Sequence, residues 1–343
     1  MSPRRPRISV VLPTYQRWPS LARTLDGLGN QTYPRDRFEV VVIDDGSGDG
    51  RSASIAQSPR PYQMQVLSQE RQGPAAARNL GLQRAQGEII LFLDDDVVPS
   101  PGLLAEHEAV HDEDPRAVVV GPMLPPQNGG RAPWVRWEEV VLQKQHRDML
   151  SGRYGPTPRQ FYTANASVRR RHLDQVGGFD PSFQRAEDVE LAYRLRDLGL
   201  TFYFSPGAAV IHDARRSFHS WRDVPYWYGR YDVVMFRTKG RSHILPVISR
   251  EFYERHRLTQ LLARLCVGRG LIRKGALGAL STLGLAAGLT GAERISLAAY
   301  SGIFNVLYWQ GVCDELKSTA EFWRWISKPS LEEAAGSVPG KER

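Results

Sequence analysis

An apolar run that ends in three consecutive carboxylates constrains this chain more than any other feature. The run extends from Gly87 to Leu93 and is followed by Asp94, Asp95 and Asp96. An uninterrupted aliphatic segment of this length is typical of a strand buried on both faces, as in a parallel sheet covered by helices. Ligands bind at the carboxyl ends of such strands, and adjacent acids there repel one another unless a cation or hydrogen-bond donors compensate. The run predicts a crevice in which a divalent metal is the natural partner.

The geometry of an extended segment divides the three acids into two sets. Side chains alternate along a strand, so Asp94 and Asp96 are expected to face one way and Asp95 the other. One of the acids can then bind a metal while its neighbour, on the other side, binds a different group. The alternative is a polar turn that follows a strand and has no further role.

Strands and helices alternate along the chain from Ile8 to about Asp213. Strands are expected at residues 8–12, 38–43, 65–67 and 88–94, and helices at 20–28, 74–85 and 187–198. This alternation predicts an α/β fold with a mainly parallel central sheet and helices on both faces. The segment 121–162 is rich in Pro, Gly and Trp, and its weak periodicity favours a mobile, aromatic-bearing insertion.

The positive charge of the chain is concentrated in one region. The whole chain carries a formal charge of +8, whereas residues 214–274 contain fourteen Lys/Arg and four Asp/Glu, a local +10. The remainder is slightly acidic, which argues against a nucleic-acid partner and favours one basic accessory surface facing membrane lipid head groups. We therefore expect a catalytic domain over residues 1–215 and a basic, aromatic and mostly helical C-terminal region over residues 216–343.

Two stretches near the C-terminus lack charge, residues 275–292 and 295–313. Each is close to the lower length limit for crossing a bilayer. A membrane hairpin, an interfacial helix and a packed pair of helices all remain open.

The N-terminal segment and the two cysteines indicate in which cellular compartment the protein is expected. The apolar run after the basic N-terminus, Ile8–Leu12, is too short for the core of a signal peptide. Cys266 and Cys313 have no metal-like spacing and are expected to be reduced core thiols. The expected location is the cytoplasm, peripheral to or anchored at the inner face of the cell membrane.

Side chains from other segments are expected to converge on the acidic crevice. Pro13 and Tyr15 follow the first strand and Asp45 follows the second, where Tyr15 can stack on a nucleobase and an Asp can accept its N–H. Arg78 lies one turn after Pro74, near a helix N-terminus that favours phosphate. A nucleotide diphosphate bridged through a metal would use all of these groups, because Mg²⁺ and Mn²⁺ bind carboxylate and phosphate oxygens together.

Six motifs in order make the chain similar to a known family. They are Ile8-Ser-Val-Val-Leu-Pro-Thr-Tyr15, Val42-Ile-Asp-Asp-Gly-Ser47, Gly73-Pro-Ala-Ala-Ala-Arg-Asn79, Leu93-Asp-Asp-Asp96, Gly177-Gly-Phe-Asp180 and Glu187-Asp188. In this order and spacing they resemble family 2 glycosyltransferases of the GT-A fold, over about residues 7–213. The resemblance implies a donor sugar linked to UDP, GDP or dTDP, a divalent cation (Mn²⁺ or Mg²⁺) and transfer with inversion at the anomeric carbon.

The resemblance also implies positions for the donor. It places Pro13 and Tyr15 beside the nucleobase and Asp45 on the N–H of the base. It places Arg78, together with Asp94 and Asp95, near the ribose and the diphosphate.

Further roles follow from the same resemblance. Asp96 matches the metal ligand of the family's DXD-type acidic motif, and His212 resembles a histidine that reaches the metal or the diphosphate. A histidine that ends a strand is also common as a structural residue. Asp188 matches the general base that removes the proton of the acceptor hydroxyl. For Glu187 and Asp188, the alternative is a pair of acids favoured by the helix dipole.

Other functions fit the sequence less well. A sugar nucleotidyltransferase needs a Gly-rich, basic triphosphate loop after the first strand, where this chain has Pro13-Thr-Tyr-Gln-Arg17. A membrane-bound non-catalytic scaffold would be favoured by loss of Asp96 or Asp188, and both are present. A dinucleotide-binding oxidoreductase is excluded because no Gly-x-Gly-x-x-Gly turn follows the first strand. Transfer of a single sugar to a lipid-linked or cell-surface glycan precursor is preferred over polymer synthesis, since Phe322-Trp-Arg-Trp325 lacks the Gln of a processive motif.

Overall fold

The computed structural model describes residues 5–127, 131–241 and 244–327. Residues 328–343, the end of the expected C-terminal region, and the basic residues 1–4 lie outside this part. The chain forms two compact units, one of residues 1–130 and 139–214 and the other of residues 131–138 and 215–343. Each unit is considered by itself.

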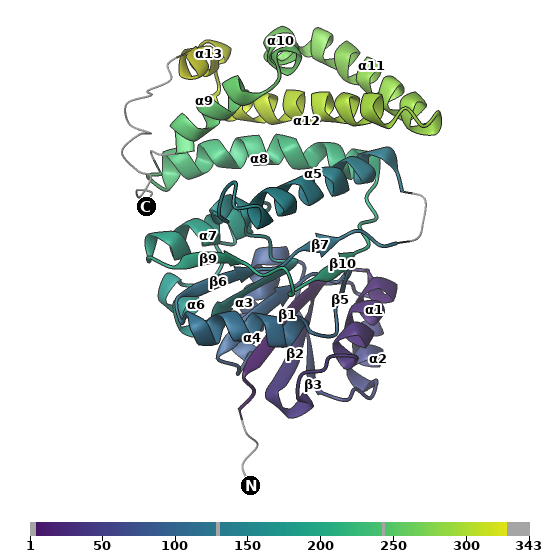
Figure 1. Ribbon diagram of the computed structural model, residues 1–343, viewed down its shortest axis with the longest axis vertical. Coiled ribbons are helices and arrows are strands. Elements are labelled where there is room, and N and C mark those ends of the chain that lie inside the picture. The colour runs from purple at the N-terminus through teal and green to yellow at the C-terminus, as the bar shows by residue number, and fades with distance from the viewer. Residues whose placement is uncertain (1–4, 128–130, 242–243, 328–343) are drawn as a thin grey trace. The chain divides into compact units, whose positions relative to one another are not determined.

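A seven-stranded sheet forms the centre of the first unit, in the order β3-β2-β1-β4-β8-β6-β9 (Figure 1). The strands are β1 (Ile8–Thr14), β2 (Phe38–Asp44), β3 (Gln63–Ser68), β4 (Ile89–Leu93), β6 (Ala117–Val120), β8 (Asn165–Arg169) and β9 (Thr201–Phe204). Neighbouring strands are parallel except where β8 pairs antiparallel with both β4 and β6. The prediction of a mainly parallel sheet is therefore confirmed.

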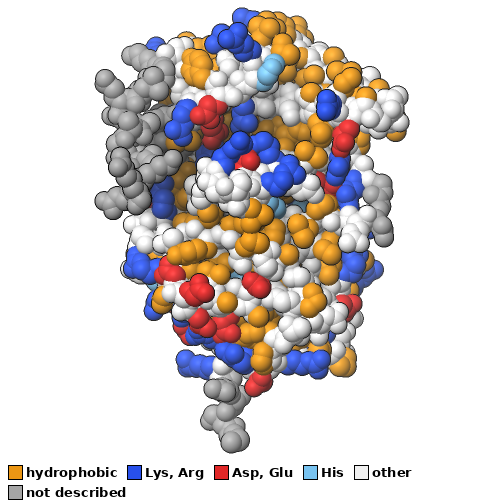
Figure 2. Space-filling model, in the orientation of Figure 1, with side chains coloured by type: hydrophobic (Ala, Val, Ile, Leu, Met, Phe, Trp, Pro, Cys, Tyr) orange, Lys and Arg blue, Asp and Glu red, His pale blue; other side chains and the backbone are white. Residues whose placement is uncertain are grey.

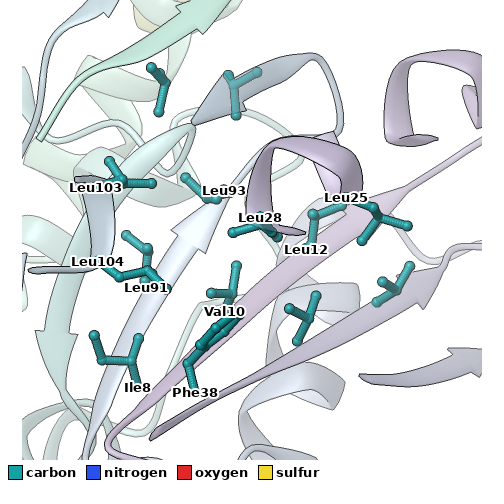
Figure 3. Packing of buried hydrophobic residues seen from close by; sticks show 14 of the residues in the cluster. Ile8, Val10, Leu12, Leu25, Leu28, Phe38, Leu91, Leu93, Leu103 and Leu104 are labelled. Carbon is teal, nitrogen blue, oxygen red and sulfur yellow. The ribbon is translucent and has the colours of Figure 1, made fainter. Parts of the chain in front are cut away.

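Helices cover both faces of this sheet, also as predicted. They are α1 (Trp18–Gly29), α2 (Arg51–Gln57), α3 (Pro74–Arg84), α4 (Leu103–Glu113), α6 (Arg170–Val176) and α7 (Glu187–Asp197), with short 3₁₀ turns η1 (Arg35–Arg37) and η2 (Pro158–Gln160). Alternate residues of β1 enter two different cores. Val10 and Leu12 pack with Leu25 of α1 and Leu103 of α4, as Figure 3 shows. Val11 packs on the opposite face in a second cluster that contains residues of α3, α6 and α7.

A second, three-stranded sheet extends the acidic end of β4. Its strands are β5 (Val97–Pro99), β7 (Met123–Leu124) and β10 (Val210–His212). β10 lies between the other two, antiparallel to β5 and parallel to β7. In this register His212 is opposite Val97, so the histidine lies next to the turn that carries the three acids.

The Pro- and Trp-rich segment differs from its prediction. The structure forms helix α5 over Pro133–Leu150 in place of an irregular insertion. Pro133 is tolerated in the first turn, and the residues after it include neither Pro nor Gly up to Leu150. Trp137 donates from Nε1 to Ser301 Oγ (2.7 Å), so this indole is a packing residue with a satisfied N–H. Residues 128–130 of the segment lie outside the described part.

The second unit is helical. Its helices are α8 (Phe218–Thr238), α9 (Ile244–Glu254), α10 (Arg257–Cys266), α11 (Gly270–Leu289), α12 (Glu293–Leu316) and α13 (Thr319–Ser327). α12 is its central helix and packs against α8, α10, α11 and α13. Within the described residues, no helix combines the length and the apolar character needed to cross a bilayer. Cys266 and Cys313 are free and buried, as expected.

Candidate active site

The loops that follow β1, β2 and β4 lie at one edge of the sheet. β1 pairs in parallel with both other strands, and Thr14 at its end is opposite Asp44 at the end of β2. The backbone N–H of Asp45 donates to the carbonyl of Thr14 over 2.9 Å, which ties the two loops together. Pro13 lies in the last part of β1 and is partly exposed at this edge.

The three acids form a turn between β4 and β5. β4 ends at Leu93, but the burial of residues 94–96 still alternates as expected for an extended segment, because Asp95 is buried whereas Asp94 and Asp96 are partly exposed. Asp95 points inward and is buried, where its carboxylate accepts a hydrogen bond from Thr14 Oγ1 (2.6 Å) and another from Arg17 Nη1 (3.3 Å). Burial raises the pKa of Asp95 to about 6, although the Thr14 and Arg17 contacts oppose the rise.

Asp96 lies between a cation and a histidine. Its Oδ2 accepts a hydrogen bond from Arg17 Nη1 over 2.8 Å, and its Oδ1 lies 3.5 Å from His212 Nε2. The structure thus brings together the two residues that the sequence suggests for a metal. In the described part of the chain, no group of three or more His, Cys, Asp or Glu side chains forms a metal site by itself.

Arg78 joins the acidic turn to the start of α7. It is buried, and it donates from Nη2 to Asp94 Oδ1 and from Nη1 to Glu187 Oε1, each over 2.8 Å. Its guanidinium also lies 5.7 Å from the ring centre of Phe179. Arg78 is therefore held among protein groups, at the junction of the acidic turn with the loop that precedes α7.

Asp188 lies in the first turn of α7, next to this junction. Burial raises the pKa of Asp188 to about 7, the neighbouring charge of Glu187 adds to the rise, and Arg78 opposes it. The Val189 N–H donates to Asp188 Oδ1 over 2.8 Å, which leaves Oδ2 as the second acceptor. A carboxyl group with a pKa near neutrality gives a carboxylate that is basic enough to act as a general base near neutral pH.

Tyr15 and Asp45 form a second group, held by the loop of residues 69–73. The Tyr15 hydroxyl accepts a hydrogen bond from Arg71 Nη1 (3.0 Å), and the Arg71 guanidinium lies 4.0 Å from the centre of the tyrosine ring. The Asp45 carboxylate accepts hydrogen bonds from Gln69 Nε2 (2.7 Å), and from the backbone N–H groups of Gln72 and Gly73 (2.9 Å each). Asp45 therefore anchors this loop, whatever else it binds.

Three contacts of the site were not predicted: those of Thr14, Arg17 and Glu187. Arg17 carried a signal, since it is a cation in the loop that follows β1, and β1 is the strand beside the acid-bearing strand β4. Two residues with strained backbone conformations also mark this site, and only the structure reveals them. Gln16 (φ 55°) and Ala186 (φ 58°) have left-handed backbones, and they precede Arg17 and Glu187. Strained non-glycine residues of this kind cluster at functional sites.

Comparison with known proteins identifies relatives over the first unit. Residues 9–177 match the family model "Glycosyl transferase family 2". The glycosyltransferase AglE of Haloferax volcanii is 29% identical over 213 residues, which cover 61% of this chain and 68% of that protein. The validoxylamine A glucosyltransferase of Streptomyces hygroscopicus subsp. jinggangensis is 33% identical over 230 residues, covering 57% of this chain and 52% of that protein. The chain thus spans only about half the length of the second relative.

Solved structures resemble the fold over most of both chains. The mannosyltransferase PcManGT of Pyrobaculum calidifontis, solved with GDP-Man and Mn²⁺, has a TM-score of 0.61 at 24% identity and covers 90% of this chain and 87% of its own. A fragment of S. aureus TarS solved with UDP-GlcNAc has a TM-score of 0.56 at 17% identity, covering 91% and 92%. At these identities the likeness establishes the fold.

Proposed function

The chain belongs to glycosyltransferase family 2 through its residues 9–177, and we propose that it transfers a single sugar from a nucleotide-diphosphate donor to an acceptor hydroxyl with inversion. The observation that carries this proposal is the pair of ion contacts made by Arg78. They connect the acidic turn, where the donor is expected, to the start of α7, where the base is expected. Donor and acceptor chemistry therefore share one cluster of charged residues.

The donor is a UDP-, GDP- or dTDP-linked sugar in this proposal. Pro13 and Tyr15 lie beside the base, and Arg71 is already stacked on the tyrosine ring that the base would meet. Asp45 faces the base N–H, while Arg78, Asp94 and Asp95 lie near the ribose and diphosphate. Structural relatives solved with GDP-Man and with UDP-GlcNAc support a nucleotide sugar.

Asp96 and His212 are the residues that would hold a divalent cation. Their donor set fits Mn²⁺ or Mg²⁺, because these ions in nucleotide sites take one or two protein ligands and complete their shell with phosphate and water oxygens. When bound, the cation would neutralise charge that develops on the leaving diphosphate.

Asp188 acts as the general base. Its carboxylate accepts the proton of the acceptor hydroxyl as the acceptor oxygen forms a bond to the anomeric carbon. The bond between that carbon and the diphosphate oxygen breaks on the opposite face, and the nucleoside diphosphate leaves with the bonding electrons. Attack from the face opposite the leaving group inverts the configuration.

The proposed acceptor is a lipid-linked or cell-surface glycan precursor. Support for it comes from the second unit, whose basic and apolar character suits a membrane surface at the cytoplasmic side. A sugar nucleotidyltransferase remains the alternative, and it would release pyrophosphate from a nucleoside triphosphate.

A thermal-shift screen with UDP-, GDP- and dTDP-sugars, each with Mn²⁺, Mg²⁺ or EDTA, tests the proposal. We expect one nucleotide to raise the melting temperature only when metal is present, and Asp96→Ala to abolish that metal-dependent rise. Asp36→Ala, at an exposed aspartate of the 3₁₀ turn η1, is the matched control and should retain the rise. Stabilisation by nucleoside triphosphates together with pyrophosphate release would favour the alternative. No shift with any nucleotide diphosphate sugar would contradict both donor and metal assignments.

A further inference from the structure

We propose that the outer face of α10 and α11 is a docking surface that lies flat on an anionic lipid bilayer. This inference deepens the proposed function, since it rests on a lipid-linked or membrane-proximal acceptor. It is carried by residues of the second unit that take no part in the proposed chemistry.

Large apolar side chains of α10 are exposed on one side of the helix. Leu258 is 70% exposed, and Leu261 and Leu265 are also exposed. Their spacing of three and four residues places them on one helical face. Ala263 and Cys266 of the same helix are buried, so the exposed face and the packed face are distinct.

The exposed face of α11 continues this apolar character without charge. Leu271 is 86% exposed and Leu289 is 79% exposed, and they are separated by 18 residues, or five turns, on the same line of the helix. Leu285 is exposed at about 40° from that line, and Ile272 and Leu283 are exposed at about 100° and 120° from it around the helix. Between Gly275 and Thr290 the helix has no charged residue at all. Exposed helices normally carry charges on the solvent side, so this face is unusual for a surface in water.

The opposite sides of both helices are already packed against α12. Leu277, Gly284 and Ala287 are the buried residues of α11, and a side chain at Gly284 would meet the ring of Tyr300 on α12. In Figure 1, α10 and α11 lie on one side of α12 and α8 lies on the other. The leucines named above therefore point away from the helical core of this unit.

Basic side chains border this face. Arg257, Arg269 and Lys274 are exposed at the start of α10, in the connection and in the first turns of α11. In the described part of the chain, none of these three side chains is held in an ion pair. Figure 2 shows orange apolar atoms together with blue Lys and Arg atoms over α10 and α11.

An anionic bilayer matches this surface better than a second copy of the chain does. Two copies that met through this face would bring the same cations toward one another, whereas acidic head groups supply the opposite charge. The apolar side chains would then enter the boundary between head groups and acyl chains, with the helices parallel to the membrane plane. This arrangement requires no membrane-spanning helix, and none is found among the described residues.

Vesicle co-sedimentation of the full chain tests the surface. The probes are vesicles of phosphatidylcholine alone and of phosphatidylcholine with 30% phosphatidylglycerol, at low and high salt. We expect binding to the anionic vesicles that weakens with salt, and at least tenfold weaker binding for the variant Leu258→Gln/Leu271→Gln/Leu289→Gln. The variant Arg257→Gln/Arg269→Gln/Lys274→Gln should lose the preference for anionic lipid. Leu150→Gln and Arg35→Gln/Arg84→Gln change exposed residues elsewhere and are the matched controls.

Two further measurements keep the outcome unambiguous. Circular dichroism of each variant must match the original chain, and sedimentation velocity reports the oligomeric state. Absence of vesicle binding, or equal binding by the leucine variant, would overturn the proposal. A dimer that the leucine variant converts to a monomer, without vesicle binding, would assign the face to a second copy. Donor-dependent thermal shifts are measured separately, so this surface can fail while the glycosyl-transfer proposal stands.

Discussion

Arg17 Nη1 donates a hydrogen bond to Asp96 Oδ2 over 2.8 Å, so the carboxylate proposed as a metal ligand is already neutralised by a cation of the protein. The same nitrogen lies 3.3 Å from Asp95. A guanidinium between two carboxylates lowers their mutual repulsion in the absence of other cations. Arg17 and a divalent metal would therefore compete for Asp96.

Removal of this competitor should strengthen metal binding. We expect Arg17→Ala to lower the dissociation constant for Mn²⁺ by about threefold in the donor-free protein, because the half-exposed ion pair contributes less than about 1 kcal/mol. Isothermal titration calorimetry or the electron paramagnetic resonance signal of free Mn²⁺ measures this change. Arg60→Ala, which removes an arginine paired with Asp26, is the control and should leave Mn²⁺ binding unchanged. Weaker Mn²⁺ binding by Arg17→Ala would contradict the competition.

If Asp188 is the general base, its substitution should slow sugar transfer without weakening donor binding. Asp188→Asn keeps the shape of the side chain and the acceptor for the Val189 N–H, but it removes the group that takes the proton. We expect donor binding within about twofold of the original chain and transfer reduced by a factor on the order of 10² to 10⁴. Calorimetric titration of the donor and a coupled assay of nucleoside diphosphate release measure the two quantities. Full transfer activity in this variant would show that another group is the base.

The raised pKa of Asp188 sets the direction of the pH profile. A base must be ionised to act, so kcat should rise with pH through about 7 and level off above it. Glu187→Gln removes a negative neighbour that favours protonation of Asp188, and the profile should move to lower pH by on the order of one unit. Rates measured from pH 5.5 to 8.5 on both proteins test this. An unchanged midpoint in Glu187→Gln would argue against Asp188 as the titrating group.

Much of the first unit could be predicted from the sequence because its strands are long apolar runs. The strands at Ile8, Phe38 and Ile89 and the helix at Glu187 were expected, and each is found with small differences at its ends. Strands β5 and β7 were missed because each has two or three residues and exists only through pairing with β10, whereas the strand that ends at His212 was expected. Local sequence carries no signal for such pairing.

The site could be predicted as a set of residues but not as a set of contacts. The contact of Arg17 with Asp96 depends on β1 and β4 being neighbours in the sheet, and the contact of Arg78 with Glu187 joins residues 109 positions apart. Helix α5 was missed because its pattern of Trp and polar residues reflects packing partners far along the chain, such as Ser301. The roles of the predicted site residues and the division at residue 215 stay predictions.

Arg78 should be a major contributor to stability. Loss of a buried partner leaves Asp94 and Glu187 without the cation between them, which costs about 3 kcal/mol or more of the free energy of unfolding. We expect Arg78→Ala to show this loss in urea unfolding and Arg78→Lys to lose less, because lysine keeps the charge. Arg84→Ala changes an exposed residue of the same helix and should stay within about 0.5 kcal/mol. Equal effects of Arg78→Ala and Arg84→Ala would contradict a structural role for the ion pairs.

A buried histidine gives the stability of the first unit a distinct pH dependence. His107 is fully buried, with Nδ1 2.8 Å from Ser167 Oγ and Nε2 3.0 Å from Asn165 Oδ1, and burial lowers its pKa to about 4. In the unfolded chain the pKa returns to about 6.5. The unfolded state therefore binds a proton between pH 6.5 and 4 that the folded state does not, so the contribution of His107 is complete above pH 6.5 and declines as the pH falls.

The stability difference between the original chain and His107→Gln isolates this effect. The free energy of unfolding of the original chain, plotted against pH, does not isolate it, because the raised pKa of Asp188 acts with the opposite sign. The folded state binds the proton of Asp188 more tightly than the unfolded state does, so Asp188 adds stability as the pH falls. Glutamine cannot protonate, so the difference between the two proteins should shrink by about 2 kcal/mol between pH 7 and pH 5. Urea unfolding at both values, with the exposed His219→Gln as control, measures it. A difference that stays constant across this range would show that His107 titrates alike in the folded and unfolded states.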